Sequence, residues 1–368
     1  MIGTSVFVNF SINAKSDKNT KKYLINYEKN DVYIYKEGKD DLDENIEEQF
    51  DKEDRKNDMS NVKFTLLGEI MMGGSVTKNV NYIYSSAFKN IYLYTKDSDF
   101  TYATLATNIT NVEKLEDTKN KYLVTKEIIN GFGALGIDSL SLATDHMIDY
   151  SENIFNNTKS ILEKNDILVA GQKDTPVYFE KGEQKIAIVS TNCVILKTKN
   201  IYGNFGISIY DKENLKKNIK EAKKIADVVI VDVHWGKEYE YTVTNQMSEI
   251  AKIAIDNGAD LVIGSHAAGV YPIVKYKGKP IIYSTGYLIS DSDLFVSQES
   301  FIFDLIIENK KITSLTMTPI FTYQKREVKL YSEYNLEKCN EILEMYNKWH
   351  NENGLESVIE NNKIVIKF

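Results

Sequence analysis

The chain has 368 residues, of which 42% are hydrophobic and 27% are charged, as in ordinary globular proteins. Its formal net charge of -8 would repel a phosphate backbone, so we predict that it does not bind nucleic acid. No apolar run reaches the length of a transmembrane helix. Cys193 and Cys339 are too few for a disulfide framework, and we expect two buried thiols.

The first 60 residues differ in composition from the rest of the chain. Residues 2–10 are mostly apolar, and residues 11–14 (SINA) before a polar stretch resemble the end of a signal peptide with its cleavage site. The positively charged start of a signal peptide is missing, so an ordinary β-strand is the alternative. Residues 23–35 can pair as one or two strands, and residues 36–60 are too charged to fold alone. We therefore interpret residues 1–60 as a signal remnant plus a charged linker, and expect an exported protein of the cell envelope or extracellular space.

From residue 62 onward, strands and helices alternate. Strands are predicted at residues 62–67, 139–142, 167–170, 186–190, 228–231 and 261–263, and helices at 122–135, 152–164, 212–225 and 246–257. They are followed by antiparallel hairpins at 270–284 and 301–318, a helix at 336–350 and a strand at 364–368. This order predicts sheets of mixed direction with helices outside.

Two segments carry clear local signals. Asp211 can cap the helix that follows it. That helix has apolar residues at helical spacing, at Leu215, Ile219, Ala222 and Ile225. The strand at 228–231 is continuously apolar, as a strand buried on both faces requires. Gly136 suits the left-handed position that closes the helix before it.

Polar residues follow four separate strands, at Glu69, Asp145-His146, His234 and His266. Because α/β sheets bind ligands at the carboxyl ends of their strands, we expect these side chains in one site. Imidazole and carboxylate groups are natural ligands of Zn, Mn or Fe, and histidine is also the usual acid or base near neutral pH. The fourth histidine, His350, is expected on the surface of the C-terminal helix.

Several stretches resemble the CapA-type family of poly-γ-glutamate capsule biosynthesis proteins. They occur in the family's order, at residues 68–73 (GEIMMG), 141–150 (SLATDHMIDY), 234–239 (HWGKEY), 258–266 (GADLVIGSH) and 283–286 (YSTG). The resemblance implies an α/β metallophosphoesterase-like sandwich of two mixed β-sheets flanked by helices. It assigns residues 61–325 to this domain, with the helix and strand of residues 326–368 packed on it.

The chain departs from the family pattern mainly in one half of the implied two-metal site. Glu69 stands where the family has aspartate, and Gly74 where it usually has arginine. Ala106 replaces a carboxylate that bridges both ions, and Ala268 replaces the second histidine of a His-Pro-His ending. Tyr287 replaces an asparagine. The half of the site that contains Glu69 is therefore expected to be lost.

The resemblance then implies one divalent metal (Zn, Mn or Fe) rather than two. Asp145, His234 and His266 are the retained ligands. Glu69 is a further candidate ligand, with a hydrogen-bond partner of His266 or a solvated strand end as alternatives. His146 would be the catalytic residue that gives a proton to a leaving group.

Two functions follow from this interpretation. The first is a cell-envelope hydrolase of capsule or poly-γ-glutamate biosynthesis, whose metal activates water against an anionic polymer or phosphoester-like substrate. The second is a non-catalytic polymer-binding or assembly protein that retains the fold. Capsule-assembly membrane proteins are expected partners in either case.

Overall fold

The computed structural model describes residues 23–28, 31–36, 61–112, 115, 122–194, 205–240, 242–292 and 298–368. The chain divides into two compact units, Met1–Asp58 and Met59–Phe368. In the first unit, β1 (Tyr23–Glu28) pairs antiparallel with β2 (Asp31–Lys36), as predicted. The signal remnant and the charged linker lie outside the described residues.

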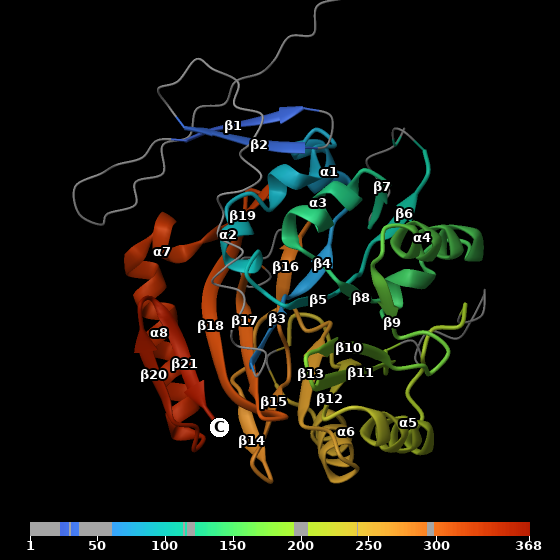
Figure 1. The fold of residues 1–368 in the computed structure, drawn as a ribbon, viewed down its shortest axis with the longest axis vertical. Coiled ribbons are helices and arrows are strands. Elements are labelled where there is room, and N and C mark those ends of the chain that lie inside the picture. Colours follow the sequence, from blue (N-terminus) through green and yellow to red (C-terminus); the bar gives the residue numbers. More distant parts are fainter. Residues whose placement is uncertain are drawn as a thin grey trace, which may run out of the picture. The chain divides into compact units, whose positions relative to one another are not determined.

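The larger sheet of the second unit is of mixed direction (Figure 1). Its strands, in order across the sheet, are β20 (Ser357–Glu360), β21 (Lys363–Lys367), β18 (Lys311–Tyr323), β17 (Glu299–Glu308), β3 (Asn61–Leu66), β5 (Phe100–Thr104), β8 (Ser139–Ser141) and β9 (Leu168–Ala170), with β19 (Glu327–Leu330) paired to β18. The strands from β3 to β9 run parallel, whereas β17 is antiparallel to both of its neighbours. The C-terminal strand β21 joins this sheet through β18.

The smaller sheet is also mixed. Its strands, in order, are β10 (Val177–Lys181), β11 (Gln184–Asn192), β12 (Val228–His234), β13 (Leu261–Ser265), β15 (Lys279–Ile282) and β14 (Val274–Tyr276). The inner four are parallel, and each edge strand is antiparallel to its neighbour. Two short parallel pairs complete the strands, β4 (Glu69–Met71) with β16 (Tyr287–Ser290) and β6 (Asn108–Thr110) with β7 (Leu123–Thr125).

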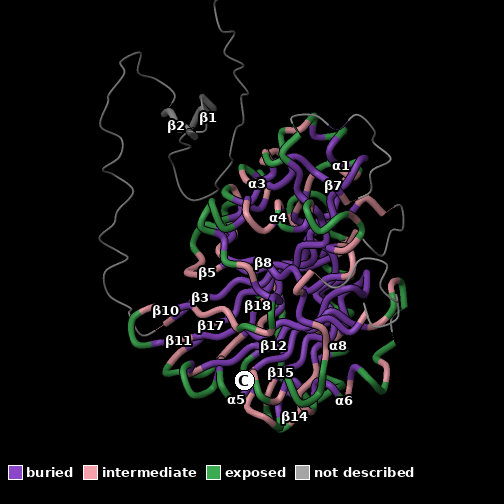
Figure 2. Tube along the Cα trace, turned by 90° about the vertical axis from the view of Figure 1, so that its right-hand side faces the viewer, coloured by how far each residue is buried: buried purple, intermediate pink, exposed green. Residues whose placement is uncertain are grey.

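Three layers of apolar side chains hold these sheets and helices together. Alternate residues of β11 face opposite ways: Ile186 and Ile188 lie in the core between the sheets, whereas Ala187 and Val189 pack under outer helices. The outer face of the smaller sheet is covered by α5 (Lys212–Ile225) and α6 (Asn245–Asp256). The larger sheet is covered by α1 (Gly74–Asn79), η3 (Tyr84–Ala87), α2 (Tyr92–Thr95), α3 (Ile128–Leu135) and α4 (Glu152–Lys164). Burial is concentrated in the strands (Figure 2), and the predicted α/β sandwich of two mixed sheets flanked by helices is confirmed.

Local signals were mostly read correctly, with two corrections. The Asp211 carboxylate caps α5 by accepting hydrogen bonds from the backbone N–H groups of Glu213 and Asn214. Ile225, predicted on the buried stripe of that helix, is instead 54% exposed, because the helix ends there and Ala226 takes the buried position. The helix predicted from residue 122 begins only at Ile128. The residues before it form β7, because pairing with β6 satisfies their backbone better than an isolated helical turn would.

The C-terminal helix buries a residue that was expected on the surface. α7 (Tyr331–Tyr334) precedes α8 (Leu336–Glu352), which packs Cys339, Leu343 and Tyr346 into the core between the sheets. His350 continues the same helical face at a spacing of four residues and is fully buried. Neither of its ring nitrogens has a hydrogen-bond partner among the described residues. The surface prediction for His350 was therefore wrong, because helical periodicity outweighs residue polarity here.

Acidification is expected to destabilise the fold through His350. Burial lowers the pKa of its imidazole to about 4, from an ordinary value of 6.5. Between pH 6.5 and about pH 4, His350 is protonated in the unfolded chain but stays neutral in the folded chain. The free energy of unfolding therefore decreases as the pH falls from 6.5 toward 4. The loss is about 3 kcal/mol. Urea unfolding across this pH range should show it in the wild type and a smaller loss in His350→Leu; equal losses in both proteins would contradict the prediction.

Candidate metal centre

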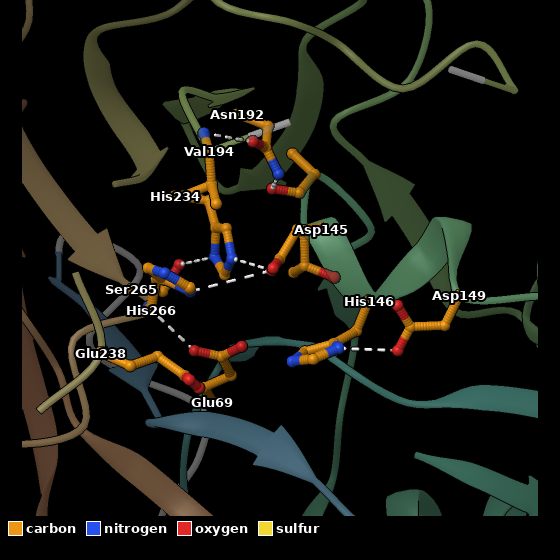
Figure 3. Close-up of polar contacts among 12 residues, drawn as sticks. Glu69, Asp145, His146, Asp149, Asn192, Val194, His234, Glu238, Ser265 and His266 are labelled. Carbon is orange, nitrogen blue, oxygen red and sulfur yellow. Dashed lines mark hydrogen bonds and ion pairs between the residues drawn. The ribbon is translucent and has the colours of Figure 1, made fainter. Parts of the chain in front are cut away.

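Four predicted site residues converge from both sheets at the carboxyl ends of their strands, and Glu69 lies beside them on a separate short strand (Figure 3). Asp145 and His146 begin the short helix η4 (Asp145–Ile148) after β8 of the larger sheet. His234 is the last residue of β12, and His266 directly follows β13, both in the smaller sheet. Glu69 opens β4. The structure therefore brings these side chains together, as the strand-end argument predicted, whereas their role stays a prediction.

Three of these side chains form a group that could hold a metal ion. The ligand atoms of Asp145, His234 and His266 all lie within 4.8 Å of one another. Asp145 Oδ1 is 2.9 Å from His234 Nε2 and 3.8 Å from His266 Nδ1. Donors around a tetrahedral zinc ion, with bonds of about 2.1 Å, are separated by about 3.4 Å. The two measured separations lie on either side of this value, and the group of one carboxylate and two imidazoles could hold a single divalent ion.

A hydrogen bond from outside the ligand group orients the imidazole of His234. Its Nδ1 atom is 2.8 Å from Ser265 Oγ, so that Nε2 faces Asp145 and the interior of the site. Such an outer hydrogen bond fixes the orientation of a metal-binding imidazole. Burial would lower the pKa of His234, but the charges of Glu69 and Asp145 and the hydrogen bond to Asp145 raise it. The negative charge of the site therefore favours a cation at this position, whether a proton or a metal ion.

Asp145 is the matching anion. Burial would raise the pKa of its carboxyl, but the hydrogen bond and charge of His234, with the charges of His146 and His266, lower it well below its usual range. The carboxylate is therefore ionised at neutral pH, as a metal ligand must be.

Glu69 lies beside this group but is not a member of it. Its Oε2 atom accepts a hydrogen bond of 2.9 Å from the backbone N–H of His266. The side chain is 1% exposed, so Glu69 is not a solvated strand end. Burial raises the pKa of this carboxyl, although the charges of His234 and His146 and the hydrogen bond from His266 oppose the rise.

His146 faces Glu69 across the site, and Asp149 holds one side of its ring (Figure 3). Its Nδ1 atom is 2.7 Å from Asp149 Oδ2, and its backbone carbonyl accepts a hydrogen bond from Asn108. The ring lies 4.2 Å from that of Tyr122, measured between centroids. Burial would lower the pKa of His146, but the hydrogen bond with Asp149 and the charges of Asp145, Asp149 and Glu69 raise it to about 9. Its imidazole is therefore protonated at neutral pH.

Three of the positions at which the family resemblance led us to expect lost ligands lie in one apolar cluster with Met71, which we call the alanine–tyrosine cluster. It consists of Met71, Ala106, Ala268 and Tyr287, each at most 1% exposed. Tyr287 stands opposite Glu69 in the pairing of β16 with β4. The Tyr287 hydroxyl donates to Glu238 Oε1 at 3.0 Å. Side chains thus fill the space on this side of Glu69.

The absence of a side chain at Gly264 makes room for a hydrogen bond next to the site. The indole N–H of Trp235, next to His234, donates to the backbone carbonyl of Tyr283 at 2.9 Å. This bond passes over Gly264, where a Cβ atom would collide with both partners. The motif of Gly264, Ser265 and His266 therefore places a ligand and an orienting hydroxyl next to a position that only glycine fits.

Sequence reasoning missed three residues that support the site: Asp149, Ser265 and Tyr122. Asp149 follows His146 by three residues, the spacing at which side chains in a helical turn meet, so this pair could have been found. Ser265 is adjacent to a predicted ligand, but only the pairing of β12 with β13 reveals that it contacts His234. Tyr122 was assigned to a helix, which concealed its contact with His146.

Comparison with known proteins identifies related sequences. The model of the family described as bacterial capsule synthesis protein PGA_cap matches residues 63–292. The capsule biosynthesis protein CapA of Bacillus anthracis is 27% identical over 279 residues, which cover 70% of this chain and 66% of that protein. The PGA biosynthesis protein CapA of Bacillus subtilis (strain 168) is 24% identical over 270 residues, covering 70% of each chain. The chain thus matches just under two thirds of the length of the Bacillus anthracis relative.

Solved structures with a similar arrangement include two nucleotidases. A 5'-nucleotidase precursor from Thermus thermophilus has a TM-score of 0.46 and 10% identity, covering 82% of this chain and 61% of that chain. A putative 5'-nucleotidase from Staphylococcus aureus has a TM-score of 0.42 and 12% identity, covering 74% of this chain and 53% of that chain.

Proposed function

This chain belongs to the bacterial capsule synthesis protein PGA_cap family, and on that premise we propose that it is a single-metal hydrolase of capsule polymer biosynthesis. One observation supports the hydrolase most directly. A carboxylate and two imidazoles from different sheets bring their ligand atoms within 4.8 Å of one another, with a protonated histidine beside them. A packed core does not require such a group, because buried charges are costly to desolvate.

The proposed ion, Zn, Mn or Fe, is held by Asp145, His234 and His266. When bound, a divalent ion lowers the pKa of a water molecule and polarises a phosphoryl or acyl oxygen. His146 donates its proton to the leaving group. Asp149 holds the opposite ring nitrogen of His146 at 2.7 Å, which leaves Nε2 as the proton-donating atom. Burial of His234 and His266 limits the access of bulk water to this part of the site.

The proposed substrate is an anionic polymer of the poly-γ-glutamate type or a phosphoester-like intermediate of its assembly. The negative charge of such a substrate suits contact with a bound divalent ion. The proposed location is the cell envelope or the extracellular space, with membrane proteins of capsule assembly as partners. Both relatives carry names that refer to biosynthesis of a capsule or of PGA. Within the described part of the chain, no helix has the length and apolar character to cross a membrane.

The alternative is a non-catalytic polymer-binding or assembly protein. The alanine–tyrosine cluster favours it, because tight apolar packing replaces groups that a two-metal phosphoesterase would need. A chain that keeps the fold and loses half of its ligands is expected to retain shape and binding more readily than catalysis.

Metal analysis of the full chain separates these functions. We expect about one equivalent of metal per chain by elemental mass spectrometry, after purification without chelator and loading with Zn²⁺ or Mn²⁺. The loaded protein should hydrolyse bis(4-nitrophenyl) phosphate faster than chelator-treated protein. One equivalent without any hydrolysis would favour the binding protein, and no bound metal under either loading would overturn the metal site itself.

A further inference from the structure

We propose that Glu69 is not a metal ligand but a positioning residue, whose side-chain oxygen holds the backbone of His266 in the conformation that aims the imidazole at the metal. This inference rests on the proposed metal site. It assigns to a buried acid a role that depends on accepting a hydrogen bond rather than on charge.

The backbone of His266 needs such support. Its φ angle is 81°, in the left-handed region that residues other than glycine rarely adopt. A residue persists there only when its surroundings fix it. The His266 N–H donates to Glu69 Oε2 at 2.9 Å, and the His266 carbonyl lies 3.4 Å from the Tyr287 hydroxyl, which shares its one proton between this oxygen and the nearer Glu238. Both backbone groups of His266 are therefore held by side chains from other elements.

Glu69 is itself built into a rigid place. Its backbone N–H donates to the carbonyl of Gly286 at 2.9 Å. The preceding residue, Gly68, has no room for a side chain: a Cβ atom would lie 2.7 Å from the carbonyl oxygen of Gly286 and from the backbone nitrogen of Leu288. The backbone at Gly68 and Glu69 thus packs closely against residues 286–288. This packing fixes the position from which the Glu69 carboxylate contacts His266.

The geometry separates this role from metal binding. Asp145, His234 and His266 form a complete group of candidate ligands without Glu69. The four side chains of the alanine–tyrosine cluster carry no nitrogen or carboxylate ligand, and the Glu238 carboxylate beside them accepts a hydrogen bond from the Tyr287 hydroxyl. A glutamate at this position reaches the N–H of His266, and an aspartate would be shorter by one methylene group.

Two conservative variants give opposite results under the two roles. Glu69→Gln keeps the length and a carbonyl acceptor but loses the charge, whereas Glu69→Asp keeps the charge and loses the reach. A positioning role predicts that Glu69→Gln, which keeps the acceptor but loses the attraction of the Glu69 charge, binds Zn²⁺ less tightly than the wild type and more tightly than Glu69→Asp and Glu69→Ala. The latter two bind about 10–100-fold more weakly than the wild type. A ligand role predicts that Glu69→Gln binds as weakly as Glu69→Ala, because a neutral amide is a poor ligand, and that Glu69→Asp binds well.

The experiment combines zinc affinity, measured by competition with a chelating dye, with hydrogen–deuterium exchange of the metal-free proteins at residues 264–268. We expect faster exchange at His266 in Glu69→Asp and Glu69→Ala, and wild-type exchange in Glu69→Gln. Weak zinc binding by Glu69→Gln together with wild-type binding by Glu69→Asp would overturn the inference. If the wild type binds no metal, the proposed function fails, while the exchange rates still test the positioning role: unchanged exchange in Glu69→Ala would refute it.

Discussion

Replacing His234 with alanine is expected to abolish metal binding at micromolar concentrations. The side chain is 1% exposed and lies between Asp145 Oδ1 at 2.9 Å and Ser265 Oγ at 2.8 Å. Its loss leaves one imidazole and one carboxylate, too few to compete with water for a divalent ion. We expect the affinity for Zn²⁺ to fall by about 100-fold or more, since losing only an outer hydrogen bond to a ligand costs 10–100-fold. Calorimetric titration of chelator-treated protein measures the change.

Two matched variants sharpen this result. His146→Gln removes the neighbouring histidine, which is not a member of the ligand group, and should keep the metal content of the wild type. Ser265→Ala removes only the hydroxyl behind His234 and should weaken zinc binding less than His234→Ala does. Circular dichroism verifies that each variant is folded. One equivalent of metal retained by folded His234→Ala would refute the proposed ligand set.

The sequence predicted the site's place better than its internal contacts. The buried strand at 228–231 and the strand-end rule brought His234 and His266 together, because parallel strands of one sheet end at one edge. The contact of Glu69 with His266 could not be predicted in the same way. This hydrogen bond joins a side chain to a backbone N–H that is 197 positions away in the sequence. It also depends on the left-handed backbone conformation of His266, which neither composition nor hydrophobic periodicity predicts.

Short helices and strands also limited the prediction of secondary structure from the sequence. Between β4 and β7 the described residues form α1, η3, α2, β5 and β6, none longer than six residues. Such segments show too few turns or alternations for periodicity to distinguish helix from strand. They nevertheless bring Ala106 and Asn108 to the site, so the region with the weakest sequence signal forms one of its walls.

Restoring the ligands at positions 106 and 268 alone is expected to destabilise the protein rather than create a second metal site. Ala106 is fully buried against the other members of the alanine–tyrosine cluster, and its backbone N–H bonds the carbonyl of Ile70, next to Glu69. In Ala106→Glu a carboxylate enters this apolar space close to another acid. An uncompensated buried charge costs about 3–5 kcal/mol of unfolding free energy. Urea unfolding with and without Mn²⁺ measures it.

Three further variants distinguish the effect of the buried charge from the effect of the space that the side chains occupy. Ala106→Gln has the size of glutamate without its charge and should be less destabilised at neutral pH. Ala106→Glu combined with Ala268→His should still bind no more than one equivalent of Mn²⁺, because the Tyr287 ring continues to fill the cluster and its hydroxyl still donates to Glu238. A second equivalent is expected only when Tyr287→Asn is added to that pair. Two equivalents bound by the double variant, with stability regained on adding Mn²⁺, would show that Tyr287 does not block the second ion and that the loss of ligands alone limits this site to one metal.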